Sequence, residues 1–104
     1  DKRLAKAITA IHEQPAEAWT LDRMADAAGM SRARFAAAFR GTVGCTPGAY
    51  LSVWRINLAC KYLRQGKPVA WTADAVGYGS ATALARAFRA NTGQSPAEWS
   101  KTAD

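Results

Sequence analysis

Apolar residues recur at intervals of three and four along most of the chain, which is the spacing of one face of an α-helix. The first such run covers residues 2–12 and ends before Pro15, because the residue before a proline is disfavoured in the helical region. Its apolar positions are Leu4, Ala5, Ile8 and Ile11. The chain contains no alternating β-branched run and no hairpin dipeptide between apolar segments. The pattern predicts an all-α protein.

Residues that begin and end helices predict where the other elements lie. Thr20 and Ser31 are expected to cap the second and third helices, and Gly29 to end the second in the left-handed conformation. Pro47 suits the first turn of a long fourth helix, which Gly66 terminates. The stripe expected on that helix includes Tyr50, Leu51, Trp54, Leu58 and Tyr62. The seven expected helices cover about 2–12, 21–28, 32–43, 47–65, 69–76, 80–92 and 96–101.

One sequence pattern occurs twice. Residues 25–31 read A-D-A-A-G-M-S and residues 73–80 read A-D-A-V-G-Y-G-S, where the second copy carries an extra Gly79. Each copy continues with a Phe-Arg pair, a glycine and a Thr-Pro or Ser-Pro pair. Such a repeat indicates one supersecondary unit built twice, here helix, tight turn, helix. We therefore expect a single domain, 1–104, that comprises a first helix-turn-helix subdomain (1–46), a linker helix (47–66) and a second helix-turn-helix subdomain (67–104).

The net charge is +6, and the basic residues coincide with the repeats. No Asp or Glu occurs between Ala27 and Ala73, and between Ala75 and Ala97 the charged residues are Arg86 and Arg89 alone. A run of like charge is often only a solvated surface. Its coincidence with two helix-turn-helix patterns favours a polyanionic partner, such as double-stranded DNA.

The helix that enters the major groove is the second of a helix-turn-helix. Phe35 and Phe39 are expected to point inward on one such helix, and Leu84 and Phe88 on the other. Ser31 and Ser80 begin these helices, where hydroxyls and backbone N–H groups can hold phosphates. The candidate DNA-binding residues are Ser31, Arg32, Ala33, Arg34, Ala36, Ala37 and Arg40, and Ser80, Ala81, Thr82, Ala85, Arg86 and Arg89.

The length of the long helix suits a protein in which two recognition helices bind the same DNA duplex. Nineteen residues, 47–65, span about 28 Å at ~1.5 Å per residue. This approaches the ~34 Å helical repeat between successive major grooves on one side of DNA. We therefore expect two recognition helices in successive major grooves.

The two expected reading faces differ in chemistry. Ala33, Ala36 and Ala37 cannot hydrogen-bond a base edge, although alanine can touch a thymine methyl group. The first unit is thus expected mainly to grip phosphate through its arginines. Arg86, with Thr82, is expected to carry most polar base readout, because a guanidinium can contact guanine through two hydrogen bonds. The alternative for Arg86 is a phosphate contact.

One position departs from the repeat. Thr72 matches Met24 in register, which is a core position, and its hydroxyl would need a partner there. Trp71 is expected either to fold over this position or to form an exposed contact surface for another domain or for RNA polymerase.

The whole chain resembles the DNA-binding domain of the AraC/XylS family of bacterial transcription regulators. The matching stretches include 19–21 (W-T-L), 28–31 (A-G-M-S), 39–40 (F-R), 46–47 (T-P), 75–78 (A-V-G-Y), 86–88 (R-A-F) and 93–96 (G-Q-S-P). The resemblance implies seven helices, two homeodomain-like helix-turn-helix subdomains and a long connecting helix. It also implies a C-terminal module that binds promoter or operator DNA, preceded by an N-terminal sensor or dimerisation domain, with RNA polymerase as a partner.

Other classes of function lack residues in this sequence. His12 is the only histidine, and Cys45 and Cys60 lack metal-ligand spacing, so no metal, cofactor or catalytic site is expected. No apolar run reaches the ~18 residues of a membrane span, and we expect a cytoplasmic protein with reduced thiols, although a redox pair is possible. The competing hypothesis is a helical protein-interaction module that uses Trp54, Trp71 and Trp99 and binds DNA weakly or non-specifically.

Overall fold

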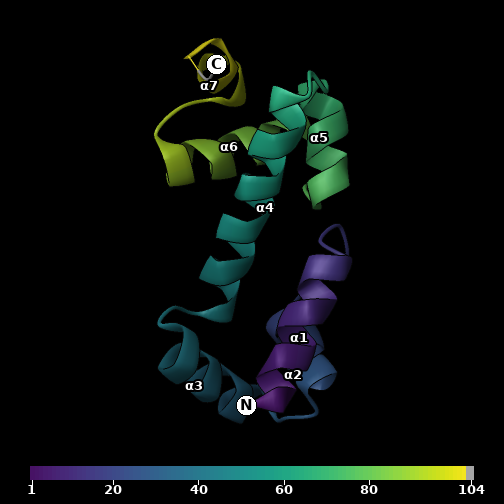
Figure 1. Ribbon diagram of the computed structural model, residues 1–104, viewed down its shortest axis with the longest axis vertical. Helices are drawn as coiled ribbons and strands as arrows, with labels where there is room; N and C mark the ends of the chain where they lie inside the picture. The colour runs from purple at the N-terminus through teal and green to yellow at the C-terminus, as the bar shows by residue number, and fades with distance from the viewer. Residues whose placement is uncertain (103–104) are drawn as a thin grey trace. The chain divides into compact units, whose positions relative to one another are not determined.

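The computed structural model describes residues 1–102, and this range contains seven α-helices and no strand. The helices are α1 (Lys2–Glu13), α2 (Leu21–Ala28), α3 (Arg32–Val43), α4 (Pro47–Arg64), α5 (Val69–Val76), α6 (Ala81–Thr92) and α7 (Pro96–Thr102) (Figure 1). The predicted all-α class and the expected helices are confirmed, with bounds that differ by one residue at four of the fourteen ends.

The chain folds as two compact units that divide within α4. The first unit covers Asp1–Ser52, and the second begins at Val53. The long helix expected at 47–66 therefore contributes its first residues to one unit and the remainder to the other. The assignment of that segment as a linker stays a prediction, and the last two residues of the predicted second subdomain lie outside the described residues.

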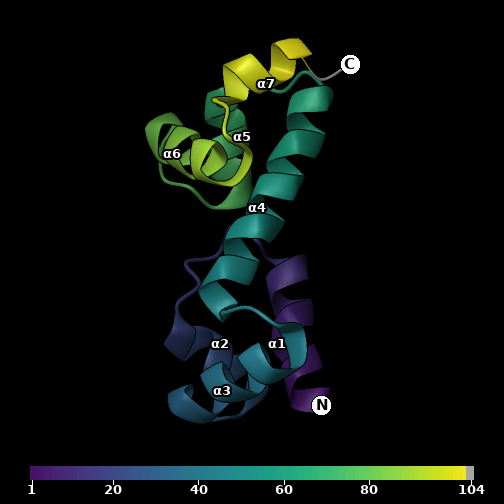
Figure 2. The ribbon, with the colours of Figure 1, turned by 90° about the vertical axis from the view of Figure 1, so that its left-hand side faces the viewer.

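In the first unit, α2 packs against both α1 and α3 (Figures 1 and 2). Phe35 and Phe39 of α3 are fully buried, as expected, and their ring centroids lie 5.6 Å apart. The expected face of α1 was wrong at one position, because Ala7 is buried whereas Ala5 is exposed. The buried residues of α1 are Leu4, Ala7 and Ile11, so a narrower stripe than expected contacts the neighbouring helices.

In the second unit, α6 packs against α5 and α7 (Figure 2). The core consists of Ile56, Ala59, Leu63, Ala73, Val76, Leu84 and Phe88. The ring of Trp99 meets Phe88 edge-on at 5.8 Å, and the guanidinium of Arg64 lies 5.0 Å from the Trp99 ring. Such cation–aromatic contacts at the surface contribute about 0.5–1 kcal/mol.

The apolar stripe expected on α4 was only partly right. Of its five residues, Leu51 is buried, and the other four are half-buried. The α4 residues within the second core are Ile56, Ala59 and Leu63, which the sequence pattern did not single out. A single stripe does not describe α4, because the helix supplies side chains to two separate cores.

The expected caps Thr20 and Ser31 are confirmed, and Ser80 caps α6 in the same way. The hydroxyl of Thr20 accepts a hydrogen bond from the Arg23 N–H at 3.1 Å. The hydroxyls of Ser31 and Ser80 accept from N–H groups three residues onward, at 3.3 and 3.1 Å. Gly29 adopts the left-handed conformation with φ +68°. Each such cap is worth about 1 kcal/mol, so these residues fix the start of α2, α3 and α6.

The buried hydroxyl of Thr72 has a hydrogen-bond partner. Its side chain is buried and donates to the Pro68 carbonyl at 2.9 Å, one helical turn earlier. Trp71 meets Tyr62 of α4 edge-on, with ring centroids 5.1 Å apart. The Lys67 ammonium lies 4.7 Å from the Trp71 ring, and the tryptophan remains 44% exposed. The role of Trp71 as a contact surface for a partner stays a prediction.

Candidate DNA-binding interface

Both helix pairs are joined by turns with the same hydrogen bonds. After α2, the Met30 N–H donates to the Ala25 carbonyl at 3.0 Å. After α5, the Tyr78 N–H donates to the Ala73 carbonyl at 2.8 Å. Gly29 and Gly77 end these helices in the left-handed conformation, which closes each turn tightly. The extra Gly79 lies after the hydrogen bonds that the two turns share and before the cap of α6. Both pairs therefore form a helix-turn-helix.

The outer face of α3 consists of small and basic residues. Phe35 and Phe39 are buried on its inner side, and the candidates Ser31, Arg32, Ala33, Arg34, Ala37 and Arg40 are exposed, while Ala36 is half-buried. The structure therefore brings all seven candidates of the first unit to the start and outer face of one helix. Their assignment as DNA contacts stays a prediction.

The outer face of α6 is more polar. Leu84 and Phe88 are buried, and the candidates Ser80, Thr82, Arg86 and Arg89 are exposed, while Ala81 and Ala85 are half-buried. By the register of the repeat, Thr82 corresponds to Ala33 and Arg86 to Ala37. Side chains that can hydrogen-bond a base edge therefore stand on α6 at positions where α3 carries methyl groups.

A shallow apolar hollow, which we call the α3 groove, lies along the outer face of α3. It has a volume of about 520 Å³ and is lined by Leu21, Ala33, Ala36, Ala37, Arg40, Thr46, Pro47 and Gly48. Four of these residues are candidates on α3, and the others begin α2 or lie at the start of α4. Sequence reasoning missed these other four, because no local pattern indicates that the starts of two further helices border the same face.

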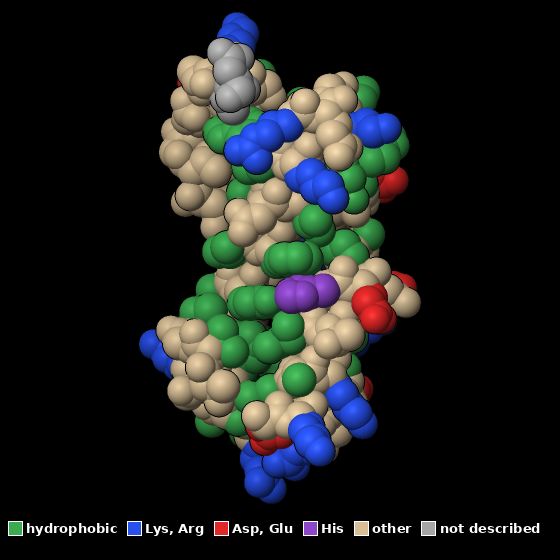
Figure 3. All heavy atoms as spheres, viewed as in Figure 1, with side chains coloured by type: hydrophobic (Ala, Val, Ile, Leu, Met, Phe, Trp, Pro, Cys, Tyr) green, Lys and Arg blue, Asp and Glu red, His purple; other side chains and the backbone are tan. Residues whose placement is uncertain are grey.

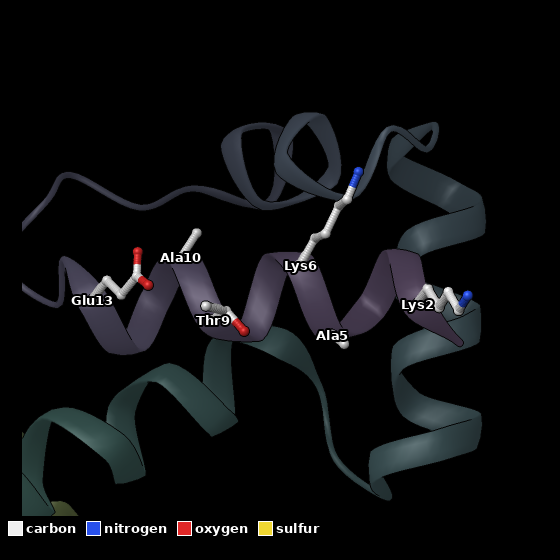
Figure 4. A pocket seen from close by; sticks show the side chains of 6 residues that line it. All are labelled: Lys2, Ala5, Lys6, Thr9, Ala10 and Glu13. Carbon is white, nitrogen blue, oxygen red and sulfur yellow. The ribbon is translucent and has the colours of Figure 1, made fainter.

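The hollow along α1 has a different lining. Its volume is about 470 Å³, and Figure 4 shows its six lining side chains along one helix. Lys2 and Lys6 lie toward one end and Glu13 toward the other, with the small side chains of Ala5, Thr9 and Ala10 between them. This lining contains none of the candidate DNA-binding residues.

The arginines of the two units differ in their partners. Arg89 donates to Glu98 at 3.1 Å, and Arg32 lies 3.7 Å from Asp22. In the described part of the chain no carboxylate lies within ion-pair distance of Arg40 or Arg86. On the face shown in Figure 3, Lys and Arg form separate patches in each unit, and acidic side chains are fewer.

Glu98 is a residue that sequence reasoning missed. It accepts the Ser95 N–H at 2.9 Å, while its own N–H donates to the Ser95 hydroxyl at 3.1 Å. Hydrogen bonds from the backbone N–H and the side chain of Ser95 to the carboxylate, followed by the charge of Arg89, lower the pKa of Glu98 below its ordinary value. The S-x-x-E spacing of residues 95–98 is a capping-box signature and could have revealed it. At the matching place of the first unit stands Ala49, so Arg40 has no equivalent anchor.

The described residues contain neither a cluster of metal ligands nor a membrane-spanning helix. Across 1–102, no three His, Cys, Asp or Glu side chains gather closely enough to hold a metal ion. The helices in this range also include none with both the length and the apolar character needed to cross a membrane. Cys45 and Cys60 are free cysteines, and burial raises the pKa of the Cys60 thiol.

The comparisons with known sequences agree on one family. The model of a family described as "Helix-turn-helix domain" matches residues 24–102. An AraC-like transcription regulator of Streptomyces antibioticus is 44% identical over 102 residues, which are 97% of this chain and 34% of that protein. The RCS-specific HTH-type transcriptional activator RclR of Escherichia coli is 39% identical over 98 residues, 93% of this chain and 34% of RclR. The chain thus corresponds to about a third of the length of these relatives.

Solved structures agree with this result. The DNA-binding domain of AdpA, a global transcriptional factor crystallised in complex with a target DNA, superposes with a TM-score of 0.90 at 30% identity, covering 95% of this chain and 90% of that one. The C-terminal domain of AraT, a response regulator from Geobacillus stearothermophilus, shares the fold with a TM-score of 0.93 at 21% identity, covering 98% and 86% of the two chains. The resemblance found in the motifs is confirmed, and the chain belongs to the helix-turn-helix domain family as a domain of the AraC type.

Proposed function

We propose that this chain binds double-stranded DNA in a sequence-specific manner, as the C-terminal module of a bacterial transcription regulator. The observation that carries the proposal is the duplicated helix-turn-helix, in which α3 and α6 each present an exposed outer face with arginines and no acidic residue. The complex of the similar AdpA domain with its target DNA supports it.

Phosphate contacts are proposed mainly for the first unit. Arg32, Arg34 and Arg40 are exposed on α3 and supply positive charge on both sides of its outer face. The oxygens of Ser31 and Ser80 already accept backbone N–H groups, so their hydroxyl hydrogens are available to donate to phosphate. These contacts would fix the register of each helix on the duplex without reading sequence.

Base readout by polar groups is proposed mainly for the second unit. Arg86 is exposed and has no carboxylate within ion-pair distance in residues 1–102, so its planar guanidinium can present two donors to guanine. Thr82 lies one turn earlier on the same face and can contact a neighbouring base, with Ala81 and Ala85 beside it. Arg89 forms an ion pair with Glu98, which fixes the position of its guanidinium. We propose that Arg89 contacts a phosphate.

Both units are proposed to bind one duplex. They carry the same frame of turn, cap and buried aromatic residues, so each is expected to place its second helix in a major groove. The resulting site has two half-sites about one helical turn apart, or ~10 base pairs. A footprint of the bound chain measures this spacing directly.

The rest of the regulator and its surroundings are also part of the proposal. Because this chain corresponds to about a third of the length of its relatives, we propose that an N-terminal sensor domain accompanies it in the full protein. RNA polymerase is the proposed protein partner, and the bacterial cytoplasm, where promoter DNA lies, is the proposed location. The domain is proposed to act by binding alone, without enzymatic activity.

A protein-interaction surface is the second candidate function. The observation that favours it is Trp71, which is 44% exposed and carries Lys67 against its ring. Aromatic side chains such as tryptophan are enriched in protein interfaces. The same chain can have both functions, so only a complete absence of duplex binding would favour the interaction surface over DNA binding.

The experiment that tests the proposal is selection of bound sequences from random duplex DNA by the whole chain, followed by affinity measurements at several salt concentrations. We expect an enriched motif with two half-sites and an affinity that falls steeply with salt, with a slope of about −0.9 per phosphate contacted. The absence of both enrichment and salt-dependent binding would reject DNA binding and favour the interaction module.

A further inference from the structure

We propose that the first unit recognises thymine through its C5-methyl group, which enters the α3 groove. This inference rests on the proposed DNA binding and adds to it what the first unit reads. It concerns the face on which Ala33, Ala36 and Ala37 stand, because these three side chains cannot hydrogen-bond a base edge.

The lining of the α3 groove is complementary to an apolar group. Besides the three alanines, Leu21 and Pro47 contribute carbon atoms to its surface. Of its two polar side chains, Arg40 ends in a charged group, and the Thr46 hydroxyl already accepts the Ala49 N–H at 3.1 Å. Beside the alanines, Leu21 and Pro47, away from the Arg40 guanidinium, a base edge with only donors and acceptors would lose its water without gaining partners.

Among the base edges exposed in the major groove, thymine alone carries an apolar group, its C5-methyl. Adenine, guanine and unmodified cytosine present donors and acceptors there. The groove has a volume of about 520 Å³, which exceeds the size of one methyl group, so adjacent thymines can share it. The chemistry of the groove therefore selects for thymine steps.

The charge around the α3 groove favours DNA over an apolar peptide as its occupant. Arg32, Arg34 and Arg40 are exposed on the same helix, and the chain contains no acidic residue between Ala27 and Ala73. A polyanion with apolar groups along its centre fits this arrangement, because its phosphates meet the arginines while its methyl groups meet the alanines. A protein ligand would need acidic groups on both sides of an apolar segment.

The decisive experiment changes only the methyl group on the DNA. Thymines in the half-site of the first unit are replaced one at a time by deoxyuridine, which lacks the C5-methyl and keeps every hydrogen-bonding group. We expect each contacted thymine to lose about fourfold in affinity, the effect of one buried methyl group. A duplex in which 5-methylcytosine·G replaces such a T·A pair should be bound more tightly than one in which C·G replaces it, because the methyl group returns to the major groove.

A protein variant locates the effect on α3. Ala37→Gly removes the methyl group on the protein side, so the loss caused by deoxyuridine should shrink in this variant. Ala5→Gly is the matched control, because Ala5 is also an exposed alanine within a helix of the first unit but does not line the α3 groove. The control should retain the full fourfold loss.

The outcomes separate the inference from the proposed function. The half-site of the first unit is defined as the one whose base preference is unchanged in Arg86→Ala. If the chain binds its selected site but deoxyuridine in this half-site does not weaken binding, the inference is overturned and DNA binding stands. A loss that persists undiminished in Ala37→Gly overturns it as well. Failure to bind any duplex DNA overturns both, and a protein that binds the groove in its place would then be sought.

Discussion

The substitution Arg86→Ala tests how the second unit recognises DNA. Arg86 is exposed on α6 and makes no ion pair within the described residues, so its truncation leaves the core untouched. Alanine is also the better helix former, and we expect the free energy of unfolding to change by less than about 0.5 kcal/mol. Any larger change in DNA affinity therefore reports on binding.

The expected loss follows from the geometry of one guanidinium. A bidentate contact with guanine contributes about 1–3 kcal/mol of discrimination, which corresponds to roughly a 5- to 150-fold loss of affinity. The loss should be large on the selected site and small on a site in which the contacted G·C pair is replaced. The dependence of affinity on salt should hardly change, because no phosphate contact is lost.

Arg89→Ala is the matched control on the same helix. Arg89 is held by Glu98 and is proposed to contact phosphate, so its removal should weaken binding equally on all sequences and reduce the salt slope by about one phosphate. The assay is equilibrium binding of both variants to cognate and base-substituted duplexes at three salt concentrations. If Arg86→Ala behaves like Arg89→Ala, Arg86 is a phosphate contact and our reasoning about base readout is wrong.

Three further predictions concern stability. The pKa of Glu98 is lowered in the folded state, so its contribution to stability is present above the ordinary glutamate pKa of about 4.5 and is lost as the pH falls through the lower folded value. The melting temperature of Glu98→Gln should therefore converge with that of the wild type in acid. An equal difference in melting temperature at all pH values would contradict this. Thr72→Val should change the unfolding free energy by less than ~1 kcal/mol in urea denaturation, because a buried methyl group offsets the lost hydrogen bond; a loss well above that would mean the hydroxyl is essential. Gly41→Ala should stabilise the protein by about 0.5–1 kcal/mol, because Gly41 lies within α3 with open space around the added Cβ. Gly29→Ala should destabilise the protein by about 1 kcal/mol, because Gly29 has a φ of +68°. Equal effects at the two glycines, measured by urea denaturation, would refute the conformational argument.

The helices and turns could be predicted because their signals are local. Thr20 and Ser31 cap the helices they precede, and Gly29 closes the turn between them, whatever packs against it. The register of buried residues was less predictable, because it depends on which helix covers which side. Ala5 and Ala7 are chemically identical, and only the packing of the neighbouring helices decides that Ala7 is buried.

The candidate site could be predicted only in part for the same reason. The exposure of Arg86 follows from its position relative to two buried residues on its own helix. The α3 groove does not follow in this way, since Leu21 and Pro47 come from different helices. The Arg89–Glu98 pair joins α6 to α7, and although the capping box could be read from the sequence, its contact with Arg89 could not.

The differences between the two units have a consequence for the form of the DNA site. A symmetric dimer reads two identical half-sites, so its operator has two-fold symmetry. Here the turns and caps repeat, but the groups that would face the bases do not, because Ala33 and Ala37 correspond to Thr82 and Arg86. Under the two proposals above, one unit favours thymine methyl groups and the other a guanine edge. A single chain of this kind should bind a site without internal symmetry and in only one orientation, which would give the proposed regulator a direction along the promoter.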